Sequence, residues 1–190
     1  MDGSQSLLPA EIRRRRFTAA DVQAMLDAGV LRDGEKVELI RGELVEMSPQ
    51  GPLHWDVTYA LSRWFRKNLP DEFGIASQGP LRLGEYDEPE PEFFIFPDGL
   101  RVNDVRGTDV LLLIEVAYSS LALDLGVKAA LYAGHGVREY WVVDVEGQRT
   151  FVHTLGGDGA YAAPRDVPFT SPLAAPGATA LVIAALAPKS

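Results

Sequence analysis

Three charged side chains stand among apolar neighbours in this sequence. Glu92 precedes an aromatic run at 93–96, Glu115 follows an apolar run at 110–114, and Lys128 lies among the leucines of a predicted helix. Burying an ionised group without a partner is costly, so such groups usually form ion pairs or bind a metal. Two carboxylates and a lysine on adjacent elements of one sheet therefore predict a site for a divalent cation that acts on a phosphodiester.

The chemistry of these residue types favours magnesium. Mg²⁺ takes oxygen ligands and keeps several of its waters, so two carboxylates from adjacent strands, Glu92 and Glu115, would suit it or Mn²⁺. A bound metal lowers the pKa of a water ligand and polarises the scissile phosphate. Lys128 would then orient the attacking water or neutralise developing charge.

The position of Lys128 follows from helical spacing. Four apolar residues lie three, four or seven positions away from it: Leu121, Leu125, Leu131 and Tyr132. This spacing places Lys128 on the face that its helix buries against the sheet. Its ammonium then needs a partner, and Glu115 on the neighbouring strand offers one. Two alternatives stay open, an ion pair with Asp124 four residues earlier and a side chain that reaches out to solvent.

Each acid also has a structural alternative. Glu115 lies late in an apolar strand, just before the turn at 118–120, and ligands in α/β sheets bind at such strand ends. It could instead form a purely structural buried pair with Lys128. Glu92 could be no more than the last member of the acidic loop 85–92.

The N-terminal part carries clear signals for a helix and a hairpin. Thr18 is a good N-cap, Asp21 stands at the capping-box position, and Gly29 ends a predicted helix over 18–28. Alternating residues over 36–47 predict a β-hairpin in which Gly42 takes a positive φ in the turn.

The remaining predicted elements alternate between helices and strands. They are a helix at 54–69, one or two strands within 73–85, strands at 93–96 and 110–117, a helix at 121–135, strands at 139–145 and 150–155, and a strand or short helix at 180–187. This order predicts a single α/β (α+β) domain with a mixed β-sheet flanked by helices, in which 110–145 forms a right-handed crossover. Residues 1–16 are predicted to be a mobile lead-in and 17–190 the domain.

Composition narrows the class of protein. The 190 residues are 46% hydrophobic, which is enough for one well-buried domain. The absence of cysteine excludes disulfides and thiolate zinc sites. No stretch has the length of a membrane span, and no apolar signal core follows the N-terminal arginines. We expect a cytoplasmic protein that does not enter a membrane.

Net charge counts against non-specific binding to nucleic acid. The formal charge is −9, whereas such binding depends on basic surface. A nuclease is not excluded, because a cation site needs carboxylates and the bound metal changes the local sign. The four arginines at 13–16 could contact phosphate, but a solvated tail is the preferred interpretation.

Several motifs resemble one known family. Residues 37–48, VELIRGELVEMS, resemble the "ELIDGELVEMS" signature of the Uma-two family of restriction-endonuclease-like proteins. Residues 113–116 with Ser119 resemble its "VEVLSPS", 124–128 its "DxxxK", and 131–144 its "LYARAGVREYWLVD". The resemblance covers roughly residues 17–155, with the motifs in the family's order.

The resemblance implies a restriction-endonuclease-like fold and Mg²⁺-dependent cleavage of DNA, since the family belongs to the PD-(D/E)xK group. Glu92 takes the place of the aspartate of that motif, Glu115 is its second acid, and Lys128 is its lysine moved onto the following helix. Glu43 and His54 become accessory residues, although position alone makes them an exposed strand acid and a helix-opening polar residue. Cleavage of both strands would suit a homodimer.

Two departures from the family pattern keep other functions open. Pro91-Glu92 replaces Pro-Asp, which lengthens the carboxylate by one methylene, and Tyr118-Ser119-Ser120 replaces Ser-Pro-Ser. The alternatives are a catalytically lapsed nuclease fold that serves as a protein-interaction module, and a hydrolase of a smaller phosphoester.

Overall fold

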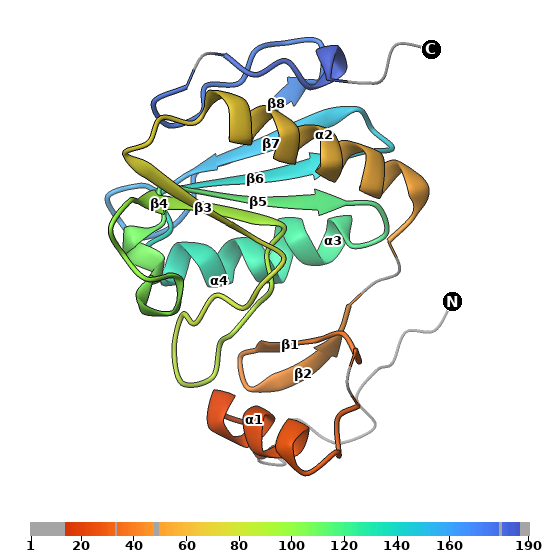
Figure 1. Cartoon of the computed structure of the whole chain (residues 1–190), viewed down its shortest axis with the longest axis vertical. Coiled ribbons are helices and arrows are strands. Elements are labelled where there is room, and N and C mark those ends of the chain that lie inside the picture. Colours follow the sequence, from red (N-terminus) through yellow and green to blue (C-terminus); the bar gives the residue numbers. More distant parts are fainter. Residues whose placement is uncertain (1–13, 33, 48–49, 179, 187–190) are drawn as a thin grey trace.

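A six-stranded mixed β-sheet forms the centre of the computed structural model, which describes residues 14–32, 34–47, 50–178 and 180–186. Its strands, in spatial order, are β3 (Phe73–Ser77), β4 (Phe93–Pro97), β5 (Leu112–Ala117), β6 (Glu139–Asp144), β7 (Arg149–Thr154) and β8 (Arg165–Pro168). Only β5 and β6 pair in parallel, and the other neighbours are antiparallel. The predicted α/β class and mixed sheet are confirmed (Figure 1).

The parallel pair requires a crossover, and a helical segment on one face of the sheet provides it. This segment was predicted as one helix over 121–135. It consists instead of α3 (Leu121–Leu123), a π-helical turn (Asp124–Lys128) and α4 (Ala129–Gly134). Wider π turns inside helices are rare overall, but many of those that occur lie at functional sites. Here the turn buries Asp124 and Lys128 together.

Helices cover both faces of the sheet (Figure 1). The long helix α2 (Pro52–Asn68) packs Leu61 and Phe65 on one face, and the C-terminal segment extends the same core. The crossover helices cover the opposite face, where Leu131 and Tyr132 are buried. Because both faces are covered, the central strands are apolar on both sides.

A smaller N-terminal unit lies beside the crossover helices (Figure 1). It contains α1 (Ala19–Asp27), capped by Thr18 as predicted, and a hairpin of β1 (Val37–Ile40) and β2 (Glu43–Glu46). Arg41 and Gly42 have φ of 53° and 82°, the two positive values of a type I′ turn. The backbone amide of Arg41 donates to Asp87 at 2.6 Å, which fixes the hairpin against the loop before β4.

Several elements differ from the sequence-based expectation. The strand β8 was not predicted, and only one strand, β3, forms within 73–85. The described part of 180–187 forms a 3-10 turn at Ile183–Ala185. Most of the predicted lead-in, residues 1–13, lies outside the described residues. Among the described helices, none is long and apolar enough to cross a membrane.

One glycine next to the crossover helix has no room for a side chain. Gly107 lies in the 3-10 turn Gly107–Asp109, and a Cβ there would meet the backbone carbonyl of His135. We expect Gly107→Ala to lower the free energy of unfolding by about 1–3 kcal/mol, since backbone must shift to admit the methyl group. Urea unfolding followed by circular dichroism measures this change.

Gly134→Ala is the matched control. Gly134 lies in α4 with open space around it, so alanine there should stabilise by up to about 1 kcal/mol through helix propensity. Equal stabilities for the two variants would contradict the packing at Gly107.

Candidate active site

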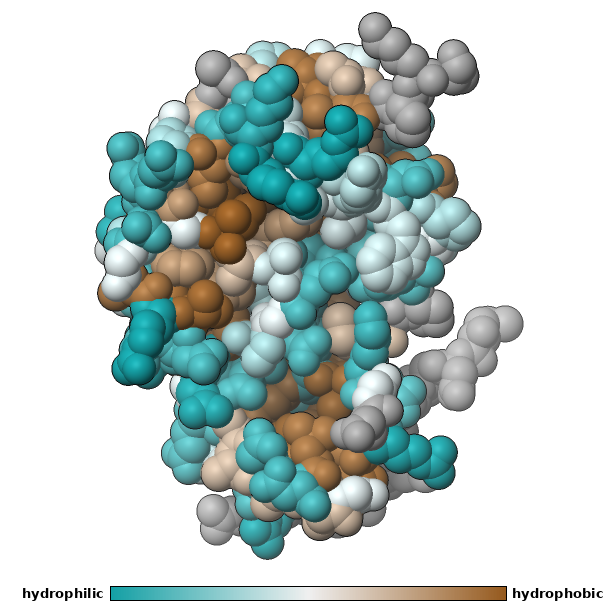
Figure 2. Space-filling model, in the orientation of Figure 1, coloured by the Kyte–Doolittle hydropathy of each residue, from teal (hydrophilic) through white to brown (hydrophobic). Residues whose placement is uncertain are grey.

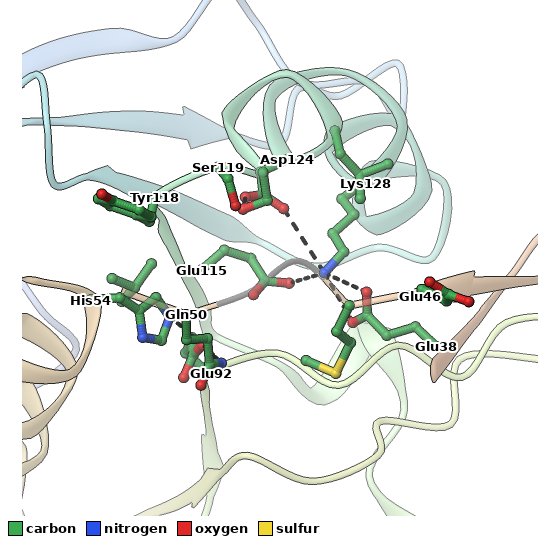
Figure 3. A pocket seen from close by; sticks show the side chains of 14 residues that line it. Glu38, Glu46, Gln50, His54, Glu92, Glu115, Tyr118, Ser119, Asp124 and Lys128 are labelled. Carbon is green, nitrogen blue, oxygen red and sulfur yellow. Dashed lines mark hydrogen bonds and ion pairs between the residues drawn. The ribbon is translucent and has the colours of Figure 1, made fainter. Parts of the chain in front are cut away.

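A small pocket lies where β5 ends, between the start of α2, the N-terminal hairpin and the π turn (Figure 3). Its volume is about 40 Å³, which admits a small ion with a few waters. Its polar lining includes Glu38, Gln50, His54, Glu92, Glu115, Asp124 and Lys128. The pocket therefore gathers side chains that are up to 90 residues apart in the chain.

Strand alternation explains the direction of Glu115. Every residue of β5 is buried, and Glu115 is its one charged residue. Leu112, Ile114 and Val116 belong to the core beneath α2. Successive side chains point to opposite faces, so Glu115 points to the crossover helix with Leu113 and Ala117. Its Oε1 accepts hydrogen bonds from Lys128 Nζ at 3.0 Å and from Tyr132 Oη at 2.8 Å.

Lys128 is held by three carboxylates at once (Figure 3). Its ammonium lies 2.9 Å from Glu38, 3.0 Å from Glu115 and 3.9 Å from Asp124. The side chain is only 6% exposed, so it does not reach out to solvent. Of the alternatives left open by the sequence, the pairs with Glu115 and with Asp124 both form.

Glu38 was missed as a site residue. It is buried on β1, and its Oε1 accepts a hydrogen bond from the Glu90 amide at 2.8 Å as well as from Lys128. The signal in the sequence was weak, because Glu38 alternates with Ile40 but Leu39 on the other face of the strand is equally buried.

Glu92 occupies the opposite side of the pocket together with His54. His54 Nε2 lies 2.7 Å from Glu92 Oε1, and both side chains are buried. Gln50 donates to the same oxygen at 3.2 Å, and Gln78 donates to Oε2 at 3.4 Å. Among the described residues, His54 Nδ1 has no hydrogen-bond partner. A neutral ring that donates from Nε2 therefore keeps a lone pair on Nδ1.

The structure brings four of the five predicted site residues together. Glu92, Glu115, Lys128 and His54 all line the pocket. Glu43 does not: its side chain is 66% exposed and lies 3.6 Å from Arg14. Its exposed position outside the pocket gives the predicted accessory role no support.

Burial and mutual repulsion set the charge state of the pocket. Burial raises the pKa of Glu115 to about 8, with Asp124 and Glu38 adding to the shift while Lys128 opposes it. Burial also raises the pKa of Asp124. Burial alone would lower the pKa of Lys128, but Glu115, Glu38 and Asp124 together raise it. The ammonium therefore stays charged, and the carboxyl groups around it outnumber it.

This excess of acids suits a divalent cation. Asp124 Oδ2 accepts from Ser120 at 2.6 Å, whereas its buried Oδ1 has no hydrogen-bond partner among the described residues. Among the residues that the structure describes, no group of three or more acids or histidines is arranged so that it could hold a metal ion. Mg²⁺ is commonly held by only one or two carboxylates with waters and substrate phosphate. The residues present meet that smaller requirement.

The raised pKa of Glu115 predicts a pH-dependent effect of its removal. A carboxyl whose pKa is higher in the folded state binds more protons there, so folding loses stability as pH rises from 4.5 to about 8. Glu115→Gln removes the titrating carboxyl and therefore also removes this loss of stability. In urea unfolding with a chelator present, the stability of the variant relative to wild type should increase across this pH range.

Glu43→Gln, which removes an exposed acid, is the control for this series. A difference between Glu115→Gln and wild type that stays constant with pH would contradict the assignment.

A solved structure resembles this fold over most of its length. It is described as a "putative nuclease belonging to DUF820 from Anabaena variabilis", and it matches with a TM-score of 0.64 at 14% sequence identity. The match covers 90% of this chain and 97% of the other. At this identity the likeness establishes the fold. No curated protein matches.

The sequence itself matches one family profile. The family, Uma2, is described as "Putative restriction endonuclease", and the match spans residues 20–185. It reaches further toward the C-terminus than the 17–155 covered by the motif resemblance and includes Glu92, Glu115 and Lys128. The resemblance inferred from the motifs is confirmed: this chain belongs to the Uma2 family.

Proposed function

We propose that this protein is a Mg²⁺-dependent endonuclease that hydrolyses DNA phosphodiester bonds. The observation that carries the proposal is the convergence of Glu92, Glu115 and Lys128 on one pocket. They come from the start of β4, the end of β5 and the crossover helix. Two acids around a small cavity can hold a metal ion, and a lysine beside them can stabilise developing charge, as metal-assisted phosphoester hydrolysis uses them.

Glu92 and Glu115 would hold the metal. When bound, Mg²⁺ supplies a water of lowered pKa and polarises the phosphate. Glu115 has one oxygen engaged by Lys128 and Tyr132. Burial favours a proton on the Glu115 carboxyl, and metal binding would displace this proton. The affinity for metal should therefore increase with pH.

Lys128 would stabilise negative charge on the phosphate. Its raised pKa keeps the ammonium charged at neutral pH. Glu38 at 2.9 Å holds it from the hairpin side, so its position is fixed before substrate arrives. A preorganised cation of this kind costs no reorganisation when charge develops.

His54 would position Glu92. The longer side chain of Glu92, where the family pattern has aspartate, is fixed by donors on both oxygens: His54 and Gln50 on Oε1, and Gln78 on Oε2. These contacts offset the freedom of the additional methylene, and they favour a working carboxylate over a lapsed one.

Two other functions each have one supporting observation. The ion pairs around Lys128 are tight and buried, as expected of a structural core in an interaction module that has lost activity. The net charge of −9 favours a smaller phosphoester over long DNA.

Metal binding and plasmid nicking test the proposal together. In calorimetry with Mg²⁺ or Mn²⁺, Glu115→Gln should abolish binding, because it removes a ligand, and should abolish nicking. Lys128→Gln should still bind metal and nick about 100-fold more slowly, a typical cost of losing one charge-stabilising donor. Circular dichroism checks that the variants fold.

Glu43→Gln controls for loss of an acid outside the pocket and should behave as wild type. Wild-type protein that binds no metal at millimolar concentration would overturn the proposal in favour of the interaction module. Metal-dependent turnover of a small phosphodiester, without nicking, would select the smaller substrate.

A further inference from the structure

The outward face of α2 carries large aromatic side chains in solvent. His54, Thr58, Leu61 and Phe65 turn to the core. On the opposite face, Trp55 is 48% exposed and Tyr59, one helical turn later, is 63% exposed. Exposed aromatic rings in register on one helix face indicate a binding surface.

Basic residues continue the same face. Helix α2 contains three of them, Arg63, Arg66 and Lys67, against a single acid, Asp56, in a chain of net charge −9. Strongly hydrophilic side chains gather over the second half of this helix in Figure 2.

These three charges are not neutralised within the described structure. Arg63 lies 5.8 Å from the centre of the Tyr59 ring, and Arg66 donates to Ser62 at 3.2 Å, but in that part of the chain none of the three forms an ion pair. Elsewhere, some exposed arginines have acid partners, as in Arg82–Glu88 and Arg101–Asp104, whereas Arg138 and Arg165 form no ion pair among the described residues. The charge on α2 is therefore available to an anionic ligand.

A hollow of about 390 Å³ opens beside these residues. It is lined by Arg63, Trp64, Lys67 and Asn68 from α2 and by Leu186 from the C-terminal segment. This volume lies within the range of small-ligand sites and could receive one nucleotide.

The face is continuous with the pocket. The Trp55 ring lies 6.0 Å from that of His54, which lines the pocket. Gly51, the N-cap of α2, lies against the ring of Tyr118, another lining residue. From His54 to Lys67 the helix rises by about 20 Å. This length fits a footprint of about four nucleotides, the lower end of the site sizes of single-strand-binding folds.

We propose that the α2 face, from Trp55 to Lys67, binds single-stranded DNA and leads it into the pocket. This inference rests on the proposed function. Aromatic side chains stack on unpaired bases, whereas a duplex keeps the faces of its bases covered. Basic side chains beside them neutralise phosphates, and the acidic remainder of the surface confines the strand to this path.

A second copy of the chain fits this face less well. A two-fold interface would place the same patch on both partners, so that Arg63, Arg66 and Lys67 face their own equivalents with one acid to offset them. Like charges directly opposed across an interface repel.

Fluorescence anisotropy of labelled DNA tests the inference with the full chain, in chelator so that no cleavage occurs. A single strand of about 12 nucleotides should bind more tightly than the same sequence held in a hairpin duplex. Tyr59→Ala should weaken binding by roughly 5- to 150-fold through lost stacking. Arg63→Gln with Lys67→Gln should weaken it and reduce the salt slope by about 1.4.

Two controls match these changes in exposed residues elsewhere. Leu26→Ala removes an exposed apolar side chain on α1, and Arg101→Gln removes an exposed arginine. Both should bind DNA as wild type. Equal affinity for single strand and duplex, or α2 variants that bind as wild type, would overturn the inference. The inference would also be overturned if light scattering showed a dimer that Tyr59→Ala dissociates while DNA binding stays unchanged.

Failure of the two proposals can be told apart. Strand binding in chelator reports the α2 face without the metal, whereas cleavage with Mg²⁺ also requires the pocket. If strand binding depends on α2 but the protein cleaves nothing with Mg²⁺, the α2 surface is supported and the nuclease activity is excluded. If the α2 variants bind and cleave DNA as wild type does, the nuclease activity is supported and the α2 surface is excluded.

Discussion

The buried ammonium of Lys128 and the carboxylates around it are the interaction on which the site depends. Glu38, Glu115 and Asp124 all face it within 2.9–3.9 Å, and Glu92 lines the same pocket. One positive charge does not balance this many acids in a buried environment, so burial and repulsion raise the pKa of Glu115. Such an arrangement adds little to stability, because apolar replacements of buried ion pairs are often equally or more stable.

Several separate elements of the fold bring these charges together. The parallel pairing of β5 with β6 requires the crossover helix, and its π turn carries both Asp124 and Lys128 to the sheet. The hairpin supplies Glu38 only because it is anchored to the loop before β4, through the Arg41–Asp87 hydrogen bond and the bridge between Leu39 and Glu88. Helix α2 closes the pocket with His54 on its buried side and carries the proposed DNA surface on the other.

Local pattern in the sequence was sufficient for much of this arrangement and insufficient for the rest. Apolar runs located β4 and β5, and helical spacing placed Lys128 on a buried face, so the positions of Glu115 and Lys128 could be predicted. Glu38 was missed because its partner is 90 residues away, and only hairpin docking brings the two together. Glu43 comes directly after the hairpin turn, where it is exposed and outside the pocket, and its accessory role stays a prediction. The π turn and β8 depend on tertiary packing and leave little local signal.

The central claim is that excess buried acid exists to bind a divalent cation. Diffraction from crystals grown with Mn²⁺, with data collected for its anomalous signal, tests it most directly. The account predicts one anomalous peak in the pocket, about 2.0–2.2 Å from carboxylate oxygens of both Glu92 and Glu115. An empty pocket at saturating Mn²⁺, with Glu115 still paired to Lys128, would contradict it and make the cluster a structural ion pair.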